Sequence, residues 1–354
     1  MKLKSALKIA YITVFFGFLV FVGVLTFTGR KNTPAKEAEV RLEITEYSKW
    51  GKSIDKYVSA NFGLRNNFIN MNNRLKYSIF NESGEKNVIL GKEDWLFYES
   101  ALHDYIGTDR LHAGEIIDTA KVIKNMQDAV TKAGGKFIFC VAPNKMEIYA
   151  EYMPYFLNSD NETGNYELLM DALEEEGVNY VDLKSVLKTE SVFGNRKLYY
   201  KLDSHWNNFG AGIAYMEIMK KAGLPFTDYS KTDYVMRRDF DGDLYGMLFP
   251  DGSTKDEGYY FKQEDRFSYT SRFMGVDDLL ITTVCKEASN PKVRLYRDSF
   301  GNALYTFFAN DFCDAKISRA TEYDMTGITE GELVVVEIVE RNIANILKNN
   351  PLNS

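Results

Sequence analysis

The sequence is poor in cysteine and in clustered basic residues. Its 354 residues include only three cysteines, Cys140, Cys285 and Cys313, which are odd in number and far apart. They form neither a disulfide framework nor a Cys-x-x-Cys metal motif, so we expect small core residues. The net charge is -7, and no Lys/Arg cluster is present. Nucleic acid is therefore not expected as a partner, because binding its phosphates requires such clusters.

Histidine is equally scarce, with three residues in the whole chain. His103 and His112 lie near Glu115, but they lack the i, i+4 spacing of a helical zinc site and have no cysteine nearby. We expect these two histidines on a solvated loop and at a helix start. Neither a metal nor a cofactor is expected.

One long run without charge lies near the N-terminus, over residues 9–29. A helix of this length spans roughly 30 Å, about one bilayer core. No convincing small-residue cleavage site follows, so we expect an uncleaved signal anchor, with cleavage as the alternative. Three lysines and the α-amino group precede the span, and three basic residues follow it. This balance slightly favours the N-terminus inside the cell and the remaining chain outside.

The rest of the chain shows no internal repeat and no low-complexity segment. We expect a cytoplasmic tail (1–8), the membrane anchor (9–29), a polar stalk containing a proline (30–45) and one large domain (46–354). An irregular insertion rich in Asp, Gly and Tyr occupies about 225–290 of that domain.

Within the large domain, a short hairpin over 87–98 is followed by apolar runs that alternate with helical patterns. This rhythm predicts an α/β fold with a mainly parallel central sheet covered by helices on both faces. The predicted strands lie in 136–144, 178–183, 292–300, 316–320 and the start of 332–347. The predicted helices are 113–135, 166–177, 210–223 and 301–312.

Functional groups in such sheets lie at the carboxyl ends of the strands. That rule selects five places in the chain: Asn144, Asp182, the Asp203/His205 segment, Ser299 and Arg341.

Ser299 stands where a predicted strand becomes a helix, in the sequence Arg297-Asp298-Ser299. Free backbone N–H groups at a helix N-terminus can stabilise an oxyanion, and Gly301 and Asn302 follow directly as candidates for such contacts. The alternative is structural, because serine is a preferred N-cap residue.

A nucleophilic serine needs a base, and the Asp203-Ser204-His205 segment offers one. A neutral imidazole can accept the serine proton, and a carboxylate on its other nitrogen fixes the tautomer. In an extended segment residues i and i+2 project to the same side, so Asp203 can reach His205. The alternative is that Asp203 forms a turn while His205 and Trp206 pack together.

Five sequence blocks in this order resemble the DHHW family, the SGNH-hydrolase-like O-acetyltransferases that include the alginate enzymes AlgX and AlgJ. The blocks are "LGKEDWLFY", "APNKMEIYAEYMP", "LDSHWNNFGAGIAY", "YRDSFGNAL" and "VVVEIVERN". The resemblance covers about 60–347 and implies an SGNH-hydrolase-like three-layer sandwich. It also implies Asp203 as orienter, His205 as base and Ser299 as nucleophile.

The chain departs from the family pattern at two positions. Ser204 replaces the second histidine of the family motif, and Asn342 replaces a tyrosine that follows Glu-Arg in the alginate enzymes. Ser204 is not in the implied triad, and we interpret it as a bystander. Arg341 can orient a ligand or the triad, or form an ion pair with Glu337 or Glu340; both interpretations stay open.

Three further residues are weighed as contacts. Asn144 can meet substrate or an oxyanion, or shape a turn that follows Pro143. For Lys145 we favour the turn. Trp206 is expected to form a wall of the substrate pocket.

The resemblance implies a membrane-anchored extracellular O-acyltransferase that acts on a polysaccharide or cell-envelope glycan through an acyl-enzyme. It further suggests a membrane-bound acyltransferase as the partner that supplies acyl groups. One alternative is a carbohydrate esterase with the same triad. The other is a glycan-binding or assembly subunit without turnover.

Overall fold

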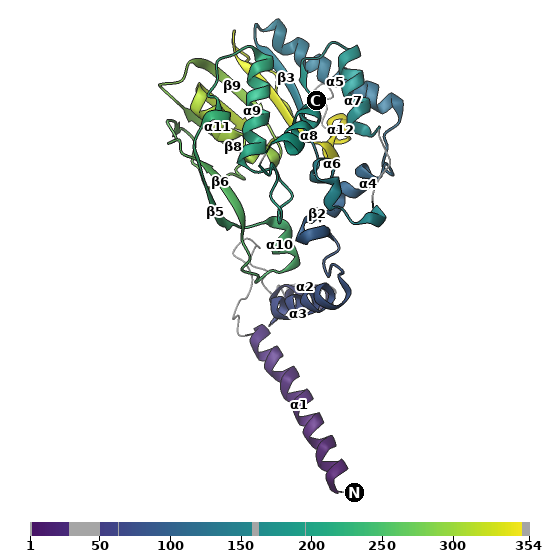
Figure 1. Cartoon of the computed structure of the whole chain (residues 1–354). Coiled ribbons are helices and arrows are strands. Elements are labelled where there is room, and N and C mark those ends of the chain that lie inside the picture. The colour runs from purple at the N-terminus through teal and green to yellow at the C-terminus, as the bar shows by residue number, and fades with distance from the viewer. Residues whose placement is uncertain (1, 28–49, 63, 158–162, 195, 349–354) are drawn as a thin grey trace. The chain divides into compact units, whose positions relative to one another are not determined.

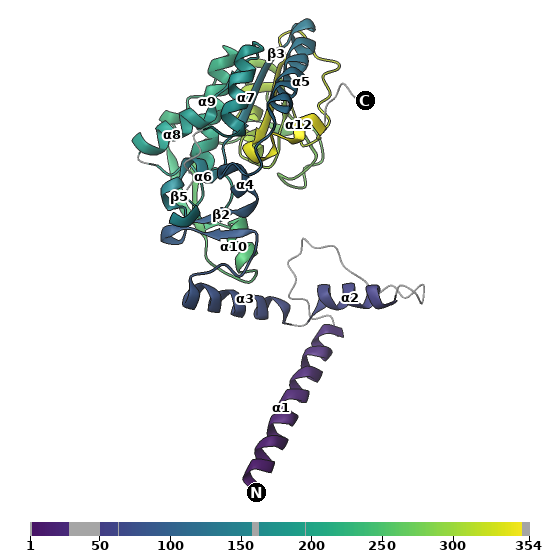
Figure 2. The same cartoon turned by 90° about the vertical axis from the view of Figure 1, so that its right-hand side faces the viewer.

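The computed structural model describes residues 2–27, 50–62, 64–157, 163–194 and 196–348. The chain divides into two compact units, Met1–Lys86 with Tyr245–Ser253, and Asn87–Leu244 with Thr254–Ser354 (Figures 1 and 2). The expected stalk, 30–45, lies outside the described residues, and the other expected domain boundaries stay predictions.

The first unit contains the long apolar helix α1 (Lys2–Phe27). Its segment Ala6–Thr26 is long and apolar enough to cross a membrane, which agrees with the span expected over 9–29. Two more helices follow, α2 (Trp50–Asn61) and α3 (Arg65–Leu75), and α3 continues into a π-helix, η2 (Lys76–Phe80). A further helix, α10 (Asp243–Leu248), begins in the second unit and ends in the first.

The second unit is built on a seven-stranded sheet of order β4-β3-β11-β9-β10-β8-β7. The first five strands are parallel to one another. Strand β8 pairs antiparallel with β10, and β7 pairs antiparallel with β8, so the prediction of a mainly parallel sheet is confirmed. In sheet order the strands are β4 (Tyr180–Val181), β3 (Lys136–Ala142), β11 (Leu333–Val339), β9 (Asn290–Tyr296), β10 (Phe312–Ser318), β8 (Leu280–Val284) and β7 (Ser268–Tyr269).

Helices cover both faces of this sheet, because its central strands are apolar on both sides. In β3, Phe137, Phe139 and Val141 enter one core and the intervening residues enter the other. The first core includes α5 (Ala113–Lys132), α7 (Asn165–Glu175) and α12 (Asn345–Lys348). The second includes α8 (Leu183–Phe193), α9 (Asn208–Ala222) and α11 (Tyr305–Asp311), visible in Figure 1. The three-layer α/β sandwich is thus confirmed.

The structure adds elements that the sequence patterns did not predict. Helix α8 was missed, and α4 (Leu102–Tyr105) and α6 (Lys145–Ile148) are single turns. The hairpin of β1 (Val88–Leu90) and β2 (Leu96–Tyr98) agrees with the prediction.

Two expectations about the sequence are corrected by the structure. The segment 225–290 is only partly an insertion: β5 (Tyr234–Phe240) and β6 (Asp256–Phe261) form a hairpin, but β7 and β8 extend the main sheet. Cys140 and Cys285 are buried as expected, whereas Cys313 is exposed. Cys313 lies on β10 next to the antiparallel part of the sheet, where one strand face meets solvent.

Candidate active site

Ser299 lies three residues beyond the end of β9 and precedes a short 3₁₀ helix, η8 (Phe300–Asn302). The turn is held by Asp298, whose Oδ1 accepts the Phe300 N–H at 2.9 Å. The other oxygen of Asp298 accepts the Val339 N–H at 2.6 Å and the Asn342 side chain at 3.1 Å. Asp298 therefore ties the end of β9 to the end of the neighbouring strand β11, which fixes where Ser299 is presented.

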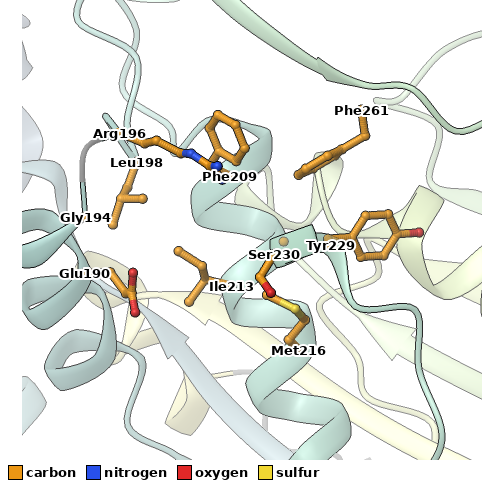
Figure 3. A pocket seen from close by; sticks show the side chains of 11 residues that line it. Glu190, Gly194, Arg196, Leu198, Phe209, Ile213, Met216, Tyr229, Ser230 and Phe261 are labelled. Atoms are coloured by element: carbon orange, nitrogen blue, oxygen red, sulfur yellow. The ribbon is translucent and has the colours of Figure 1, made fainter. Parts of the chain in front are cut away.

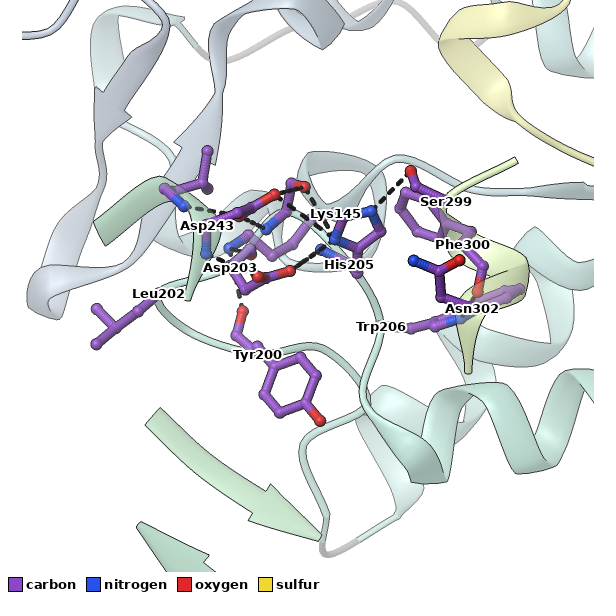
Figure 4. Close-up of polar contacts among 12 residues, drawn as sticks. Lys145, Tyr200, Leu202, Asp203, His205, Trp206, Asp243, Ser299, Phe300 and Asn302 are labelled. Atoms are coloured by element: carbon purple, nitrogen blue, oxygen red, sulfur yellow. Dashed lines mark hydrogen bonds and ion pairs between the residues drawn. The ribbon is translucent and has the colours of Figure 1, made fainter. Parts of the chain in front are cut away.

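His205 lies between α8 and α9, and its ring bridges Ser299 and Asp203 (Figure 4). Its Nε2 is 2.8 Å from Ser299 Oγ, and its Nδ1 is 2.8 Å from Asp203 Oδ1. The same carboxylate oxygen accepts the His205 backbone N–H, also at 2.8 Å. Asp203 thus holds both the main chain and the ring of His205, and the predicted proximity of the three residues is confirmed.

The segment that carries Asp203 and His205 does not have the expected backbone. It is a bent loop closed by an isolated bridge between Tyr199 and Trp206, and it is not the end of a strand of the main sheet. The loop enters α9 through Asn207, whose side chain accepts the N–H groups of Phe209 and Gly210. A capped helix therefore anchors the histidine in place of a strand.

Trp206 connects the histidine loop to the serine turn. Its side chain is only 1% exposed, and its Nε1 donates to the Phe300 carbonyl at 2.9 Å. The two rings also meet edge to face, with centroids 5.2 Å apart. The interpretation of Trp206 as a pocket wall is therefore wrong: the residue is a buried link between the two halves of the site.

Lys145 fixes the other end of the histidine loop. Its Nζ donates to the carbonyls of Tyr200 at 3.1 Å, Lys201 at 3.3 Å and Asp203 at 2.6 Å (Figure 4). Burial lowers the pKa of Lys145 to about 8. Lys145 lies at the start of a helical turn, as expected. It also stabilises the loop that carries Asp203, by donating to three of its carbonyl groups.

Asp243 is the site residue that the sequence did not reveal. Its N–H donates to Asp203 Oδ2 at 2.8 Å, and its carboxylate accepts from the Ser204 N–H at 2.7 Å and Oγ at 2.6 Å. Its Oδ2 also lies 3.6 Å from Nδ1 of His205. Ser204 is therefore part of this network and not a bystander. Nothing in the sequence distinguishes Asp243 from the other aspartates of its segment.

The charges around His205 favour its protonated form. Burial opposes the imidazolium, but the hydrogen bond and negative charge of Asp203, helped by Asp243, raise the pKa of His205 above its usual value. Burial acts against ionised Asp203 too, yet the hydrogen bond from His205 keeps its pKa low. The pKa of Asp243 is raised by burial and by the nearby Asp203 charge.

Most of the expected oxyanion or substrate contacts are occupied by protein groups. The Gly301 N–H is hydrogen-bonded to Glu337, and a Cβ at Gly301 would lie 2.4 Å from Cβ of Arg297. The Asn302 side chain accepts from Arg297 and donates to Asp277 at 3.2 Å. Gly301 and Asn302 therefore shape the serine turn, and the Gly301 N–H is not free to bind an oxyanion.

Asn144 and Asn342 are likewise engaged. The amide of Asn144 donates to Asp104 at 3.1 Å and accepts from Arg341 at 3.3 Å, while Asn342 donates to Asp298. Asn144 is buried, so its interpretation as a structural residue is the one that fits.

Arg341 and the Ser299 backbone retain donors. Arg341 follows β11 and lies over the Phe300 ring, 5.6 Å from its centroid. Within the described ranges its only hydrogen bond is to Asn144, and it makes no ion pair with Glu337 or Glu340. Glu340 instead pairs with Lys184 at 2.6 Å, so the ion-pair interpretation of Arg341 is wrong.

For the Ser299 N–H, no acceptor is found among the residues that the structure describes. A backbone N–H in that position, next to Oγ, is placed as an oxyanion donor.

The donor atoms of Asp203, His205 and Asp243 lie within 4.8 Å of one another, close enough for a metal ion. However, the 2.8 Å between Asp203 and His205 is a hydrogen-bond distance, and a proton shared there leaves no lone pair on Nδ1 for a ligand bond. The set fits a proton-relay arrangement better than a metal site. His103 and His112 are exposed and His112 precedes α5, as expected, but His103 lies in the helical turn α4 and not in a loop.

A pocket of about 280 Å³ lies along α9 (Figure 3). Phe209, Ile213 and Met216 of α9 form one side, and Tyr229 and Phe261 contribute aromatic rings. Its lining includes none of the three residues Ser299, His205 and Asp203. The three residues therefore lie outside this pocket, and the His205 side chain is 24% exposed.

Comparison with known proteins confirms the resemblance. A family model described as "SGNH hydrolase-like domain, acetyltransferase AlgX" matches residues 88–309. The "Probable alginate O-acetylase AlgJ" of Pseudomonas syringae pv. tomato is 24% identical over 220 residues, which cover 61% of this chain and 52% of AlgJ. The chain thus matches about half the length of this relative.

Two solved structures share the fold. PatB1 of Bacillus cereus gives a TM-score of 0.55 at 16% identity, covering 72% of this chain and 96% of PatB1. A DHHW family protein from Eubacterium siraeum gives 0.53, also at 16% identity, covering 74% of this chain and 98% of the other.

Proposed function

Because the chain belongs to the family of SGNH hydrolase-like AlgX acetyltransferase domains, we propose that it is an O-acetyltransferase acting on a polysaccharide or cell-envelope glycan. The observation that supports this most directly is the continuous pair of 2.8 Å contacts from Ser299 through His205 to Asp203. This is the arrangement that converts a serine hydroxyl into a nucleophile.

In the first step, Ser299 Oγ attacks the carbonyl carbon of an acyl donor while His205 Nε2 takes the hydroxyl proton. Asp203 stabilises the imidazolium that forms. The Ser299 N–H and the nearby Arg341 guanidinium are the donors for the negative carbonyl oxygen. The donor's leaving group then departs with the proton from His205, and an acetyl ester remains on Ser299.

In the second step, a sugar hydroxyl transfers its proton to His205 and attacks the ester carbonyl. The acetyl group moves to the sugar oxygen, and Ser299 recovers its proton from His205. Water attacking the same ester would make the protein a carbohydrate esterase. A glycan-binding or assembly subunit without turnover is the third possibility, and it requires no ester at all.

The proposed location is the outer side of a cell membrane. Helix α1 would anchor the chain with its N-terminus inside, and the second unit would act outside. Acetyl groups made inside the cell would then need a carrier across the membrane. A membrane-bound acyltransferase is the class of partner that would deliver them.

Intact-mass measurement tests the covalent step. The full chain in detergent is incubated with 4-nitrophenyl acetate, alongside Ser299→Ala as control. A gain of one acetyl group in the wild type and not in Ser299→Ala is expected. No Ser299-dependent gain, with release of 4-nitrophenol also absent, would sink the acyl-enzyme and favour the non-catalytic subunit. Addition of a glycan then separates transfer to sugar from release of acetate.

A further inference from the structure

The helix formed by α3 and η2 carries its polar face inward. Residues three to four positions apart define this face, and they are Asn66, Asn70, Asn73 and Tyr77. Asn66 and Asn70 donate to Asp251 at 3.1 and 3.4 Å, and Asn73 donates to the Leu248 carbonyl at 2.6 Å. Asn66 and Asn73 are 2% and 1% exposed. Amide hydrogen bonds, together with the Tyr77 ring that meets Phe249 edge to face at 6.3 Å, therefore fix this helix to the 245–253 segment of its own unit.

The opposite face of the same helix is apolar and open. By helical spacing it consists of Phe68, Met71, Leu75 and Ile79. Met71, Leu75 and Ile79 are 57%, 48% and 62% exposed. An ordinary surface helix turns its apolar stripe toward the core. Here the arrangement is reversed, so the apolar face needs a cover that this chain does not supply among its described residues.

The charge of this segment indicates what covers it. Residues 65–80 contain Arg65, Arg74 and Lys76 and no Asp or Glu, although the chain as a whole carries -7. At 100° per residue these three side chains fall between the polar and apolar faces. Basic side chains that flank an apolar stripe are the pattern of a helix lying in the headgroup layer of a membrane with anionic lipids.

The apolar face also continues onto the candidate membrane span. The ring of Phe68 meets the ring of Phe18 in α1 edge to face, with centroids 6.1 Å apart. Phe18 lies inside the segment that is apolar enough to cross a bilayer. One end of the open face is thus joined to the part of the unit that is expected in lipid.

We propose that α3 and η2 form an interfacial helix that lies on the membrane surface, with Met71, Leu75 and Ile79 in contact with anionic phospholipid. This contact adds to the anchor formed by α1. It would hold the membrane-proximal unit flat against the bilayer and restrict its motion relative to the lipid.

Site-specific fluorescence on the full chain tests this proposal. In a Cys313→Ser background, whose remaining cysteines are buried, single cysteines replace Met71, Leu75 or Ile79 and carry an environment-sensitive fluorophore. The chain is reconstituted into phosphatidylcholine vesicles with or without phosphatidylglycerol. Two spin-labelled lipids serve as quenchers, one labelled at headgroup level for positions 71, 75 and 79, and one labelled deep in the acyl chain for the α1 control. Phe16→Cys in α1 is the positive control, and Val192→Cys, 74% exposed in the second unit, is the matched negative control.

The expected result is a blue shift and strong quenching at 71, 75 and 79, greater with phosphatidylglycerol, and neither effect at 192. Replacing Arg65, Arg74 and Lys76 by Gln should remove the dependence on anionic lipid. Signals at the three positions equal to that at 192, with 16 quenched, would overturn the proposal while leaving the α1 anchor intact. Protection that appears only when a membrane protein is added would also overturn it, in favour of a protein partner.

Discussion

Asp243 accepts two hydrogen bonds from Ser204, one from the backbone N–H at 2.7 Å and one from Oγ at 2.6 Å. This pairing places a second carboxylate beside His205, 3.6 Å from Nδ1. Asp203 accepts a hydrogen bond from the imidazole itself. Asp243 instead fixes Ser204, the residue between Asp203 and His205, and adds negative charge near the ring. We therefore regard Asp243 as a positioning residue for the proposed base.

The first prediction concerns Asp243→Asn. Loss of one negative charge should lower the pKa of His205, because Asp243 contributes to raising it. The acid limb of the pH profile for acetyl transfer should move to lower pH, and the plateau rate should fall about tenfold as the loop loses a charged hydrogen bond. Asp241→Asn is the control: it removes the same charge from an exposed carboxylate two residues away, so its acid limb should stay in place. An unmoved acid limb in Asp243→Asn would refute the electrostatic role.

The second prediction is the pH dependence of the unmodified protein. His205 must be neutral to accept a proton from Ser299, and its pKa is raised despite burial. Activity should therefore rise with pH, with an acid limb above the ordinary imidazole value of about 6.5. The sign for stability is opposite: a raised pKa means that His205 stabilises the fold at low pH, and this contribution is lost as pH rises through that pKa. Initial rates of acetyl transfer from pH 5 to 9 provide the measurement, and an acid limb at or below about 6.5 would contradict the prediction.

The third prediction concerns Trp206→Phe. A smaller aromatic ring replaces the indole, and the Phe300 carbonyl loses the donor that it meets at 2.9 Å. The carbonyl keeps the longer hydrogen bond from the Ala303 N–H at 3.3 Å, so loss of the shorter one should cost about 0.5–1.5 kcal/mol in the free energy of unfolding. Because that carbonyl follows Ser299 directly, the acetylation rate should fall with stability. Chemical denaturation and the single-turnover rate measure the two effects. A destabilised variant that acetylates at the normal rate would show that the link is only structural.

Much of this site was predictable, because apolar runs in the sequence indicate the strands of the central sheet, and polar residues directly after each run mark the carboxyl ends of those strands. Ser299 and Arg341 were found in this way, at the ends of β9 and β11. Asp203 and His205 were also found, but for a partly wrong reason. They lie in a bent loop anchored by Trp206 and Asn207, and not at a strand end.

The remaining contacts depend on long-range packing that local patterns do not encode. Asp243 reaches Ser204 across 39 positions of sequence, and Lys145 reaches the Asp203 carbonyl across 58. Gly301 and Asn302 lie close after Ser299 in the sequence, which suggested oxyanion contacts. In the structure the buried Glu337 accepts the Gly301 N–H, and the buried Arg297 donates to the Asn302 side chain. Only the folded chain decides between a free donor and an occupied one.

The fourth prediction concerns metals. The carboxylates of Asp203 and Asp243 and the His205 ring lie near enough to hold an ion, but a proton between Asp203 and His205 serves the proposed mechanism better. Dialysis against EDTA should leave acetyl transfer unchanged. Added Zn²⁺ should inhibit, because a metal on Nδ1 would displace that proton and withdraw electron density from Nε2. Loss of activity in EDTA that returns with a divalent cation would contradict this prediction.

The fifth prediction follows from Glu337, a carboxyl group with no exposed surface beneath the serine turn. Burial, and then the charge of Asp298, raise its pKa well above the usual range, although it accepts the Asp298 N–H at 3.3 Å and the Gly301 N–H. A carboxyl whose pKa is raised on folding binds a proton that the unfolded chain releases. The native state therefore loses stability as pH rises from the unfolded pKa, about 4.3, toward the raised value.

Glu337→Gln removes this titration and keeps an oxygen acceptor for the two N–H groups. The free energy of unfolding should then fall less between pH 5 and pH 8 than in the wild type, by about 1.4 kcal/mol for each pKa unit titrated in that interval. Urea unfolding of the full chain in detergent at both pH values gives the difference. Glu322→Gln, at an exposed position, is the matched control and should keep the wild-type slope. If Glu337→Gln kept that slope as well, the carboxyl would be ionised in the native protein, with the nearby Arg297 guanidinium as its counter-charge.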